Sequence, residues 1–444
     1  MSQSNSVPLD TPYKRILRFL LSNIFNVRNT NVIVDYIKNN FQHLTVDEVR
    51  QLIHLSSVQY KLRTVPLVLA IIALKHNKLE NPKEVFLQLL TQPNLLTTAL
   101  SIYEQVNGNV KPLAASLKKA LAEKIVTFND YSLIKGNVTI NNFKLSDVIK
   151  LTHPKAISKD QEILFKQILD GDTPKLDNWE TVISSAKTQQ ERQVQWERLL
   201  LDGKLVNLNL LRNLNNLVDY SVNPNFVLDK LSNINLDKVN LFQLLNATLN
   251  IKNKVILDGL NTLINTQSKI SLDGRTLIIL DISGSMSASI DHNKTRLQVA
   301  TMLAFYLGRI CENSLVVFTA GDDGASIGKH KIYTKDVKNV SYTKFFEDTC
   351  ATNSEIGAGG IFTRQCLEWC EDNTPGRFNR TVVISDSHDC DRYNKVSRPF
   401  TAYSFLLNIA NTSNEMVTDS NWSSEINGWS ENLPLFIKEF ESNF

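Results

Sequence analysis

Along the first 270 residues, apolar and polar positions alternate with the period of amphipathic helices. Apolar residues recur at spacings of three and four within short segments, and Pro or Gly separates these segments. Such a succession of short helices is typical of HEAT-like α-solenoids, although the chain has no strict sequence period. The pattern predicts helices at residues 11–25, 45–58, 65–76, 81–92, 111–124, 144–153, 160–171, 178–203 and 205–219.

Two of these segments carry explicit signals for a helix start. Thr11 precedes Pro12, which suits the first turn because proline lacks the N–H that a helix start leaves unpaired. Thr45 is followed three residues later by Glu48, the spacing of a capping box. We therefore expect helices to begin at these two threonines.

The pattern changes near residue 271. Short runs rich in Ile, Leu and Val, which predict buried strands, alternate with helical segments. This alternation indicates a parallel sheet with helices on both faces. The predicted fold is therefore an all-α helical-repeat domain at 1–270, followed by a doubly wound α/β domain at 271–444. The strands are expected at 275–280, 314–320, 381–387 and 400–407, and the helices at 295–310, 342–350, 363–372 and 433–441.

Composition is that of a soluble globular protein, with 42% hydrophobic and 21% charged residues. No apolar run approaches the roughly 18 residues of a membrane span, and the N-terminus lacks the apolar segment of a secretory signal. All five cysteines follow residue 310, and disulfide stapling is not expected in so large a chain. We expect a cytoplasmic protein without membrane contact.

Charge divides unevenly between the two parts. Residues 1–270 hold 32 Lys and Arg against 23 Asp and Glu, whereas residues 271–444 hold 16 against 22. Residues 1–155 carry the whole excess, with 19 basic against 10 acidic side chains. A basic half favours a polyanionic partner such as nucleic acid, and ordinary surface charge remains the alternative.

Polar residues gather where two predicted strands end. Asp281, Ser283 and Ser285 follow one strand, and Asp386 follows another. The carboxyl ends of parallel strands meet at one rim of the sheet, where ligands of such folds bind. Carboxylate and hydroxyl oxygens suit Mg²⁺ best, or Mn²⁺ or Ca²⁺. The alternative is an Asp-capped turn whose serines bond the backbone.

Catalytic patterns are weak in this sequence. The segment reads I-S-G-S-M rather than the G-x-S-x-G of serine hydrolases, and no histidine partner follows. Residues 386–391, "DSHDCD", lack the second ligand pair of a zinc site and read as a polar loop. We therefore expect no catalytic activity.

The segment "DISGS" resembles the D-x-S-x-S signature of the metal-ion-dependent adhesion site of von Willebrand factor A domains. The resemblance implies a divalent cation held by Asp281, Ser283, Ser285, a threonine after a Gly-Gly turn, and Asp386. Here Ile361 stands where that threonine is usual, and Thr363 comes two residues later. Either Thr363 is the ligand through a shifted turn, or the site lacks that ligand.

The whole chain resembles the Ro autoantigen family, whose TROVE module precedes a von Willebrand A domain. Similar stretches occur in order along the chain. The resemblance implies a helical-repeat ring that holds single-stranded 3′ ends of misfolded noncoding RNA, with Y-like structured RNA on its outer basic face. The stretches lie at 13–21, 65–76, 112–124, 145–155, 196–217 and 426–437.

RNA-contacting positions are carried over only where the residues match. The candidates are Lys118, Lys119, Lys144, Lys150, His153 and Arg63. Leu145 replaces a histidine of the family, which removes one contact. For each lysine a solvated helix face is the alternative, and for His153 a helix-capping position. Arg212 is expected to be structural.

The sequence is thus interpreted as a monomeric, non-catalytic RNA-binding protein of the Ro type. It would hold misfolded or structured RNA and could pass it to a nuclease. The rival interpretation is a metal-dependent protein-interaction or structural module, including a virus-particle role, with reduced RNA affinity. In that case the cation would receive an acidic side chain from a protein partner.

Overall fold

The structure is a computed structural model of the chain. It describes residues 11–25, 29–172, 174, 183, 186–249, 251–266, 271–291, 294–357, 359–391, 399–410 and 422–443. By internal contacts the chain forms two compact units, Met1–Asn178 together with Asn443–Phe444, and Trp179–Ser442. Each unit is described by itself.

The first unit is built from helices. They are α1 (Pro12–Phe25), α2 (Thr30–Phe41), α3 (Val46–His54), a π-helical turn η1 (Leu55–Gln59), α4 (Thr64–Lys75), α5 (Pro82–Leu89), α6 (Pro93–Asn107), α7 (Ala115–Ile125), α8 (Asp130–Lys135), α9 (Leu145–Thr152) and α10 (Lys159–Asp170). Both predicted helix starts are confirmed. Lys14 N donates to Thr11 Oγ1 at 3.2 Å, and Thr45 and Glu48 form the reciprocal capping box.

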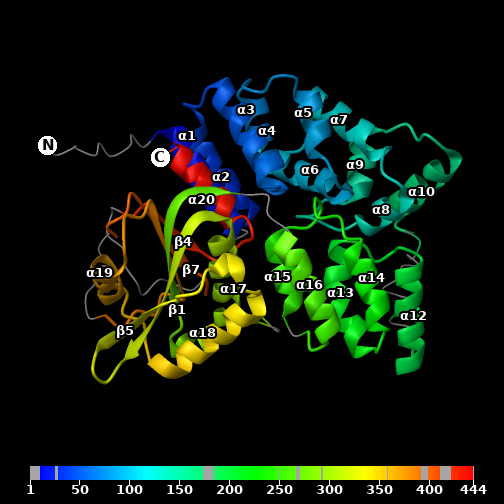
Figure 1. Cartoon of the computed structure of the whole chain (residues 1–444). Coiled ribbons are helices and arrows are strands. Elements are labelled where there is room, and N and C mark those ends of the chain that lie inside the picture. The colour runs from blue at the N-terminus through cyan, green and yellow to red at the C-terminus, as the bar shows by residue number, and fades with distance from the viewer. Residues whose placement is uncertain are drawn as a thin grey trace. The chain divides into compact units, whose positions relative to one another are not determined.

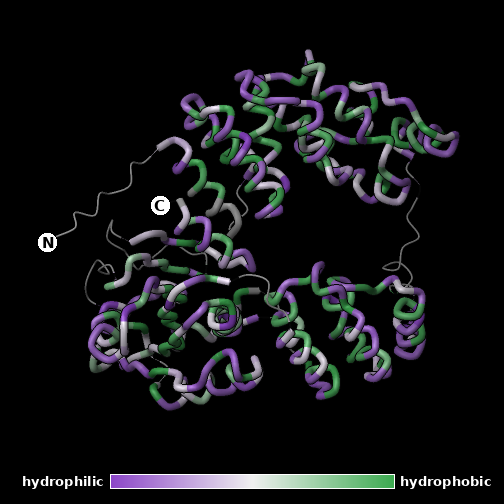
Figure 2. Tube along the Cα trace, turned by 45° about the horizontal axis from the view of Figure 1, so that its top comes forward, coloured by the Kyte–Doolittle hydropathy of each residue, from purple (hydrophilic) through white to green (hydrophobic). Residues whose placement is uncertain are grey.

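Packing of this unit follows the apolar stripes. Along the helices of both units, apolar and polar positions alternate (Figure 2). Helix α4 is the exception, since its residues from Val65 to Ala73 are all buried, and it contacts α2, α3, α5 and α6. A helix that is apolar all round is stable only when it is enclosed by its neighbours. Helix α4 is therefore a central element of the first unit.

The second unit opens with more helices, α12 (Gln189–Leu201), α13 (Leu208–Asp219), α14 (Pro224–Ser232), α15 (Leu241–Thr248) and α16 (Lys254–Thr266). The prediction of one helix over 178–203 is wrong at residues 186–188, which are not helical. Thr188 instead caps α12 in a box with Glu191. Most of the earlier part of the predicted helix lies outside the described residues.

The expected change to alternating strands and helices is confirmed. The strands are β1 (Leu272–Asp281), β2 (Ser289–Asp291), β3 (Lys294–Thr295), β4 (Cys311–Asp322), β5 (Ile327–Ile332), β6 (Arg380–Ser385), β7 (Tyr403–Asn408) and β8 (Ser424–Asn427). The helices are α17 (Arg296–Ile310), α18 (Tyr342–Ile356), α19 (Thr363–Asn373) and α20 (Leu433–Asn443), with 3₁₀ turns η2 (Gly284–Ser287) and η3 (Val337–Asn339).

The main sheet has the order β5-β4-β1-β6-β7-β8, and every pair in it is parallel except β4 with β5. The chain leaves β1 for β4 on one side and returns to β6 on the other. The carboxyl end of β1 therefore lies at a topological switch point, where doubly wound sheets bind ligands. The α/β fold class predicted for this region is confirmed.

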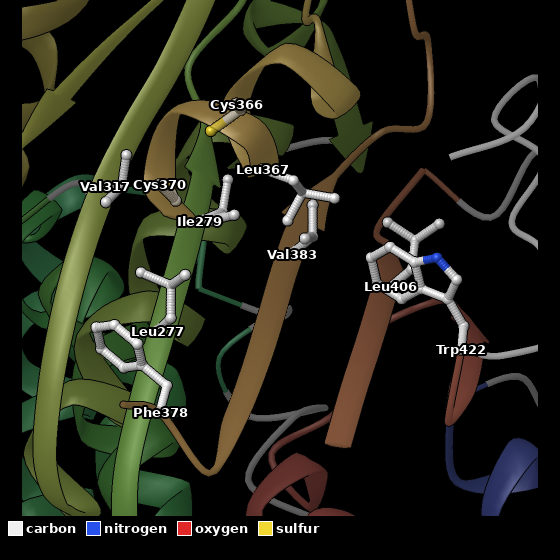
Figure 3. Close-up of a cluster of buried hydrophobic side chains, with 10 residues drawn as sticks. All are labelled: Leu277, Ile279, Val317, Cys366, Leu367, Cys370, Phe378, Val383, Leu406 and Trp422. Atoms are coloured by element: carbon white, nitrogen blue, oxygen red, sulfur yellow. The ribbon is translucent and has the colours of Figure 1, made fainter. Parts of the chain in front are cut away.

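Helices cover both faces of the sheet (Figure 1). Leu277 and Ile279 of β1 point to a face where α19 contributes Cys366 and Cys370 (Figure 3). Helix α17 packs on β1 and β4, and Phe405 of β7 contacts α20 through its aromatic rings. Burial of these strands from both sides explains their continuous apolar runs.

Residue 271 thus marks a change of secondary structure inside the second unit, because the helices α12 to α16 group with the sheet by contacts. The assignment of 1–270 and 271–444 as domains stays a prediction. Within the described residues, no helix is both long enough and apolar enough to cross a membrane.

Candidate functional site

The end of β1 places Asp281 beside β6. The register aligns Leu280 with Ile384, so Asp281 comes next to Ser385, whose Oγ donates to Asp281 Oδ2 at 2.7 Å. The backbone N–H of Ser283 donates to Asp281 Oδ1 at 2.8 Å. The Asp281 side chain is fully buried, so both of its oxygens are fixed in place.

Burial raises the pKa of Asp281 to about 7; the hydrogen bond from Ser385 opposes this shift, and the charge of Asp386 adds to it. Two carboxylates that are buried near each other disfavour double ionisation. A cation placed between them would stabilise both charged forms. The electrostatics of this rim therefore suit a bound metal ion.

The two serines of the motif face one another. Ser283 Oγ lies 3.2 Å from Ser285 Oγ, at the start of the 3₁₀ turn η2. The turn is held by Asn353, whose amide donates to the carbonyl of Ile282, and by Gly284, whose N–H donates to Gly359 O at 3.1 Å. The Asp-capped turn considered from the sequence is thus present, and it also brings the hydroxyls together.

The Gly-Gly turn approaches this motif closely. A Cβ added at Gly359 would clash with the carbonyl of Gly321 in β4, so the packing of this turn against β4 requires glycine there. Ile361 is fully buried and pairs with Asp389 in an isolated bridge, so its side chain belongs to the core.

Thr363 is the first residue of α19. Its side chain is buried, and its hydroxyl lies near the Asp389 carboxylate without forming a well-aligned hydrogen bond. Its backbone N–H donates to Asp389 Oδ1 at 3.3 Å. A buried hydroxyl without a well-aligned partner is costly, and a metal ion is one group that would satisfy it.

Asp386, the second predicted carboxylate, is held by an arginine. Arg296 Nη1 lies 2.6 Å from Asp386 Oδ2, with the carboxylate side chain fully buried and the arginine side chain 17% exposed. The following residue, Ser387, has a left-handed φ of 64° and a buried hydroxyl without a partner among the described residues. The residue after Asp386 thus has a backbone conformation that is unfavourable for a serine.

These donors fit a hard divalent cation. The end of β1 offers the carboxylate of Asp281 and the hydroxyls of Ser283 and Ser285, and Asp386 is close enough for its charge to act on Asp281, whereas Thr363 contacts Asp389. In the described part of the chain, no group of three His, Cys, Asp or Glu could hold a metal. A metal at this rim would therefore depend on serine and threonine oxygens, and its assignment is a proposal.

The loop 386–391 has a structural task. Asp389 and Asp391 cap the N-terminus of α19: Thr363 N donates to Asp389, and Arg364 N donates to Asp391 Oδ2 at 2.9 Å. Burial raises the pKa of Asp389 to about 6. Carboxylates at a helix N-terminus satisfy unpaired N–H groups. Asp389 and Asp391 are thus explained as helix caps, without a zinc ion.

Four contributors to the rim were not predicted, namely Ser385, Arg296, Asn353 and Ser387. Ser385 and Ser387 flank Asp386 in "VISDS", which is a weak sequence signal. Arg296 and Asn353 pair with residues 90 and 71 positions away, and sequence spacing carries no signal of such contacts.

The predicted RNA positions lie on neighbouring helices of the first unit. Lys118 and Lys119 are exposed on α7, and Lys150 is exposed on α9, which packs against α7 (Figure 1). Lys144 is exposed at the residue before α9, where its N–H donates to Asp147. We call α7 and α9, with these four lysines, the cationic pair of helices.

The remaining candidates lie at helix ends. His153 is exposed and ends α9 in a left-handed conformation, with its N–H donating to Ile149 O at 2.9 Å. Its capping bond is thus made by the backbone, and the imidazole is not needed for it. Arg63 is exposed at the residue before α4. Arg212, expected to be structural, is exposed on α13.

Comparisons with known proteins support the fold. No protein-family model matches the chain, and no curated protein matches it. Among solved structures, the crystal structure of the Ro (RSR) protein of Deinococcus radiodurans is similar, with a TM-score of 0.64 at 15% sequence identity. The likeness covers 98% of this chain and 100% of that one. It shows that this chain has the fold of that protein, so the resemblance found in the sequence is confirmed for the fold.

Proposed function

We propose, from the fold that the chain shares with a Ro protein, that it binds RNA through the cationic pair of helices. The carrying observation is that Lys118, Lys119 and Lys150 are all exposed on packed neighbours, α7 and α9. Phosphates of a single strand bind such cations without sequence preference. Misfolded or structured noncoding RNA, including Y-like RNA and single-stranded 3′ ends, is the proposed ligand class.

The charge distribution supports this ligand. Residues 1–155 hold 19 Lys and Arg against 10 Asp and Glu. Lys83 pairs with Glu123 at 2.7 Å, so that acidic residue of α7 is engaged by a lysine of α5. The charge of Glu123, which is itself exposed, is thus offset by Lys83, and Lys118 and Lys119 add exposed positive charge to the same helix. The proposal includes a monomeric, cytoplasmic protein that holds RNA without cleaving it, with a nuclease as a possible recipient.

A filter-binding assay with unstructured single-stranded RNA tests this proposal. The affinity of the full chain is measured at about 50 mM and about 200 mM salt, where phosphate contacts give a steep loss. A loss of at least about tenfold supports RNA binding through phosphates. Absence of binding at the lower salt concentration overturns it.

A second function is favoured by the sheet rim, namely metal-dependent binding of a protein partner. We propose that Asp281, Ser283 and Ser285 hold Mg²⁺, with Thr363 and Asp386 completing the site. Mn²⁺ and Ca²⁺ have the same ligand preference. When bound, the cation would supply an open coordination position for a carboxylate of the partner. The buried carboxylate of Asp281 and the facing hydroxyls of Ser283 and Ser285 are the observations that support this site.

A further inference from the structure

A cleft in the second unit is lined by residues other than those assigned to the sheet rim. Two cavities, of about 170 and about 180 Å³, share the residues Leu211, Arg212, Asn246, Ala247 and Lys294 as lining. The two cavities are therefore neighbours around these side chains, and together they are called the cleft below. Helices α13 and α15 line it together with Lys294 of β3, Trp429 and Glu431.

Two cations face this cleft. Arg212 is exposed on α13, and Lys294 is half-buried in β3. A guanidinium offers paired N–H donors to phosphate, and an ammonium adds a point charge. Cations on two walls of one cleft are suited to a phosphate group between them.

An aromatic wall stands next to the cations. The ring centroid of Trp429 lies 5.6 Å from that of Phe242, which fixes the indole in place. Lys294 Nζ lies 5.9 Å from the Trp429 centroid. Trp429 is only half-buried, so part of its surface is open to the cleft that it lines. A fixed indole beside a cation is a stacking surface for a nucleobase.

Polar acceptors complete the lining. Asn246 Oδ1 is buried and has no hydrogen-bond partner among the described residues. Glu431 accepts a hydrogen bond from Gln243 Nε2 at 3.2 Å and also lines the cleft. An amide oxygen and a carboxylate accept from donors such as ribose hydroxyls or base amines. The matching ligand has an anionic end, an aromatic part and hydrogen-bond donors.

We propose that this cleft binds one nucleoside monophosphate unit. The phosphate contacts Arg212 and Lys294, the base stacks on Trp429, and a sugar hydroxyl or base amine donates to Asn246 or Glu431. Inorganic phosphate alone would leave Trp429 and Asn246 unused. The unit is either a free mononucleotide or one nucleotide of an RNA strand; in the second form the inference rests on the proposed RNA binding.

Calorimetric titration of the full chain with 5′-AMP, adenosine and inorganic phosphate tests the chemistry. We expect AMP to bind at least about tenfold more tightly than either fragment, because each fragment lacks one of the two anchors. Failure of AMP to bind, or phosphate binding as tight as AMP binding, overturns the proposal.

Variants of Arg212 and Trp429 test whether these residues bind the nucleotide. Arg212→Gln is expected to weaken AMP binding about tenfold and to leave adenosine binding unchanged. Arg198→Gln is the matched control, since Arg198 is 72% exposed on α12 and is absent from the cleft lining. Trp429→Leu is expected to abolish stacking and Trp429→Phe to retain most of it, with thermal melting to verify folding. Equal AMP affinity in wild type and Arg212→Gln overturns the assignment.

A single-stranded oligonucleotide separates the two ligand sources. If the wild type binds AMP but no oligonucleotide, the cleft assignment stands and the RNA proposal fails. If Arg212→Gln weakens both ligands, the natural ligand includes a strand nucleotide. If the oligonucleotide binds through the lysines of α7 and α9 while AMP does not bind, the RNA proposal stands and the cleft assignment fails.

Discussion

Arg296 Nη1 lies 2.6 Å from Asp386 Oδ2, so a guanidinium occupies one oxygen of a carboxylate predicted to bind metal. Arg296 is the first residue of α17, and Asp386 follows β6. A divalent cation at the rim and this guanidinium repel each other and share the same acceptor. If a cation binds at this rim as proposed, the pair therefore lowers its affinity.

Replacement of Arg296 is expected to lower the stability of the metal-free protein and to raise its affinity for Mg²⁺. In the metal-free protein, Arg296→Gln should lower the free energy of unfolding by about 3 kcal/mol, since it leaves Asp386 as a buried carboxylate without its ion pair. Mg²⁺ affinity should rise at least about tenfold, because a competing positive charge is removed. Thermal melting across a Mg²⁺ titration measures both effects.

Arg309→Gln is the control for Arg296→Gln. Arg309 lies on the same helix, at its other end, and donates to Lys338 O at 2.8 Å. Its loss should alter stability without changing the response to Mg²⁺. An unchanged Mg²⁺ response in Arg296→Gln would show that the guanidinium does not control the site.

Asp281 predicts an unusual pH dependence of stability. Burial raises its pKa from 3.8 to about 7 in the folded chain, so the folded state keeps a proton that the unfolded state releases between these pH values. The free energy of unfolding of the metal-free protein should therefore fall as pH rises through this window. Asp281→Asn cannot ionise and should lack this fall, as denaturant unfolding at several pH values would reveal.

Metal binding should reverse that effect in the wild type. Mg²⁺ stabilises the ionised carboxylate, so added Mg²⁺ should restore stability above neutral pH in the wild type and not in Asp281→Asn. Equal stabilisation of both proteins by Mg²⁺ would remove Asp281 from the metal site.

Substitution of Thr363 tests whether this threonine is a metal ligand or whether the site lacks a threonine ligand. Thr363→Val keeps the shape and removes a buried hydroxyl near the Asp389 carboxylate, so the free energy of unfolding of the metal-free protein should change by no more than about 1 kcal/mol. If Thr363 is a ligand, Mg²⁺ affinity should fall about tenfold in calorimetry. The control is Thr349→Val, whose hydroxyl donates to Phe345 O at 2.8 Å. Unaltered Mg²⁺ affinity in Thr363→Val means that the site lacks the threonine ligand.

Much of the fold was predictable because local signals carry it. The capping box of Thr45 and the apolar runs of β1, β4 and β6 lie within a few residues of sequence. Strand β5 was missed because none of its residues is fully buried; exposed and half-buried positions alternate along this edge strand, which reads "IGKHKI". Strand β8 was missed because it has four residues. Short or edge strands carry too little apolar pattern to be recognised.

The rim was predictable in part. Asp281, Ser283 and Ser285 follow one strand end, so their proximity is a property of the local chain. The contact of Arg296 with Asp386 requires the packing of α17 against the sheet. Contacts between residues far apart in the chain leave no local pattern in a single sequence. Neither this ion pair nor the cleft at Trp429 could therefore be predicted.

The most direct test of the central claim removes the four lysine charges of the cationic pair of helices. Lys118, Lys119, Lys144 and Lys150 are changed together to Gln, with Lys329→Gln and Lys331→Gln on β5 as the charge control. The plot of log affinity for single-stranded RNA against log salt should become less steep, by about 0.7 for each contacting lysine that is removed. The control should have the slope of the wild type. If the lysine variant keeps the wild-type affinity and slope, RNA binding through α7 and α9 is contradicted.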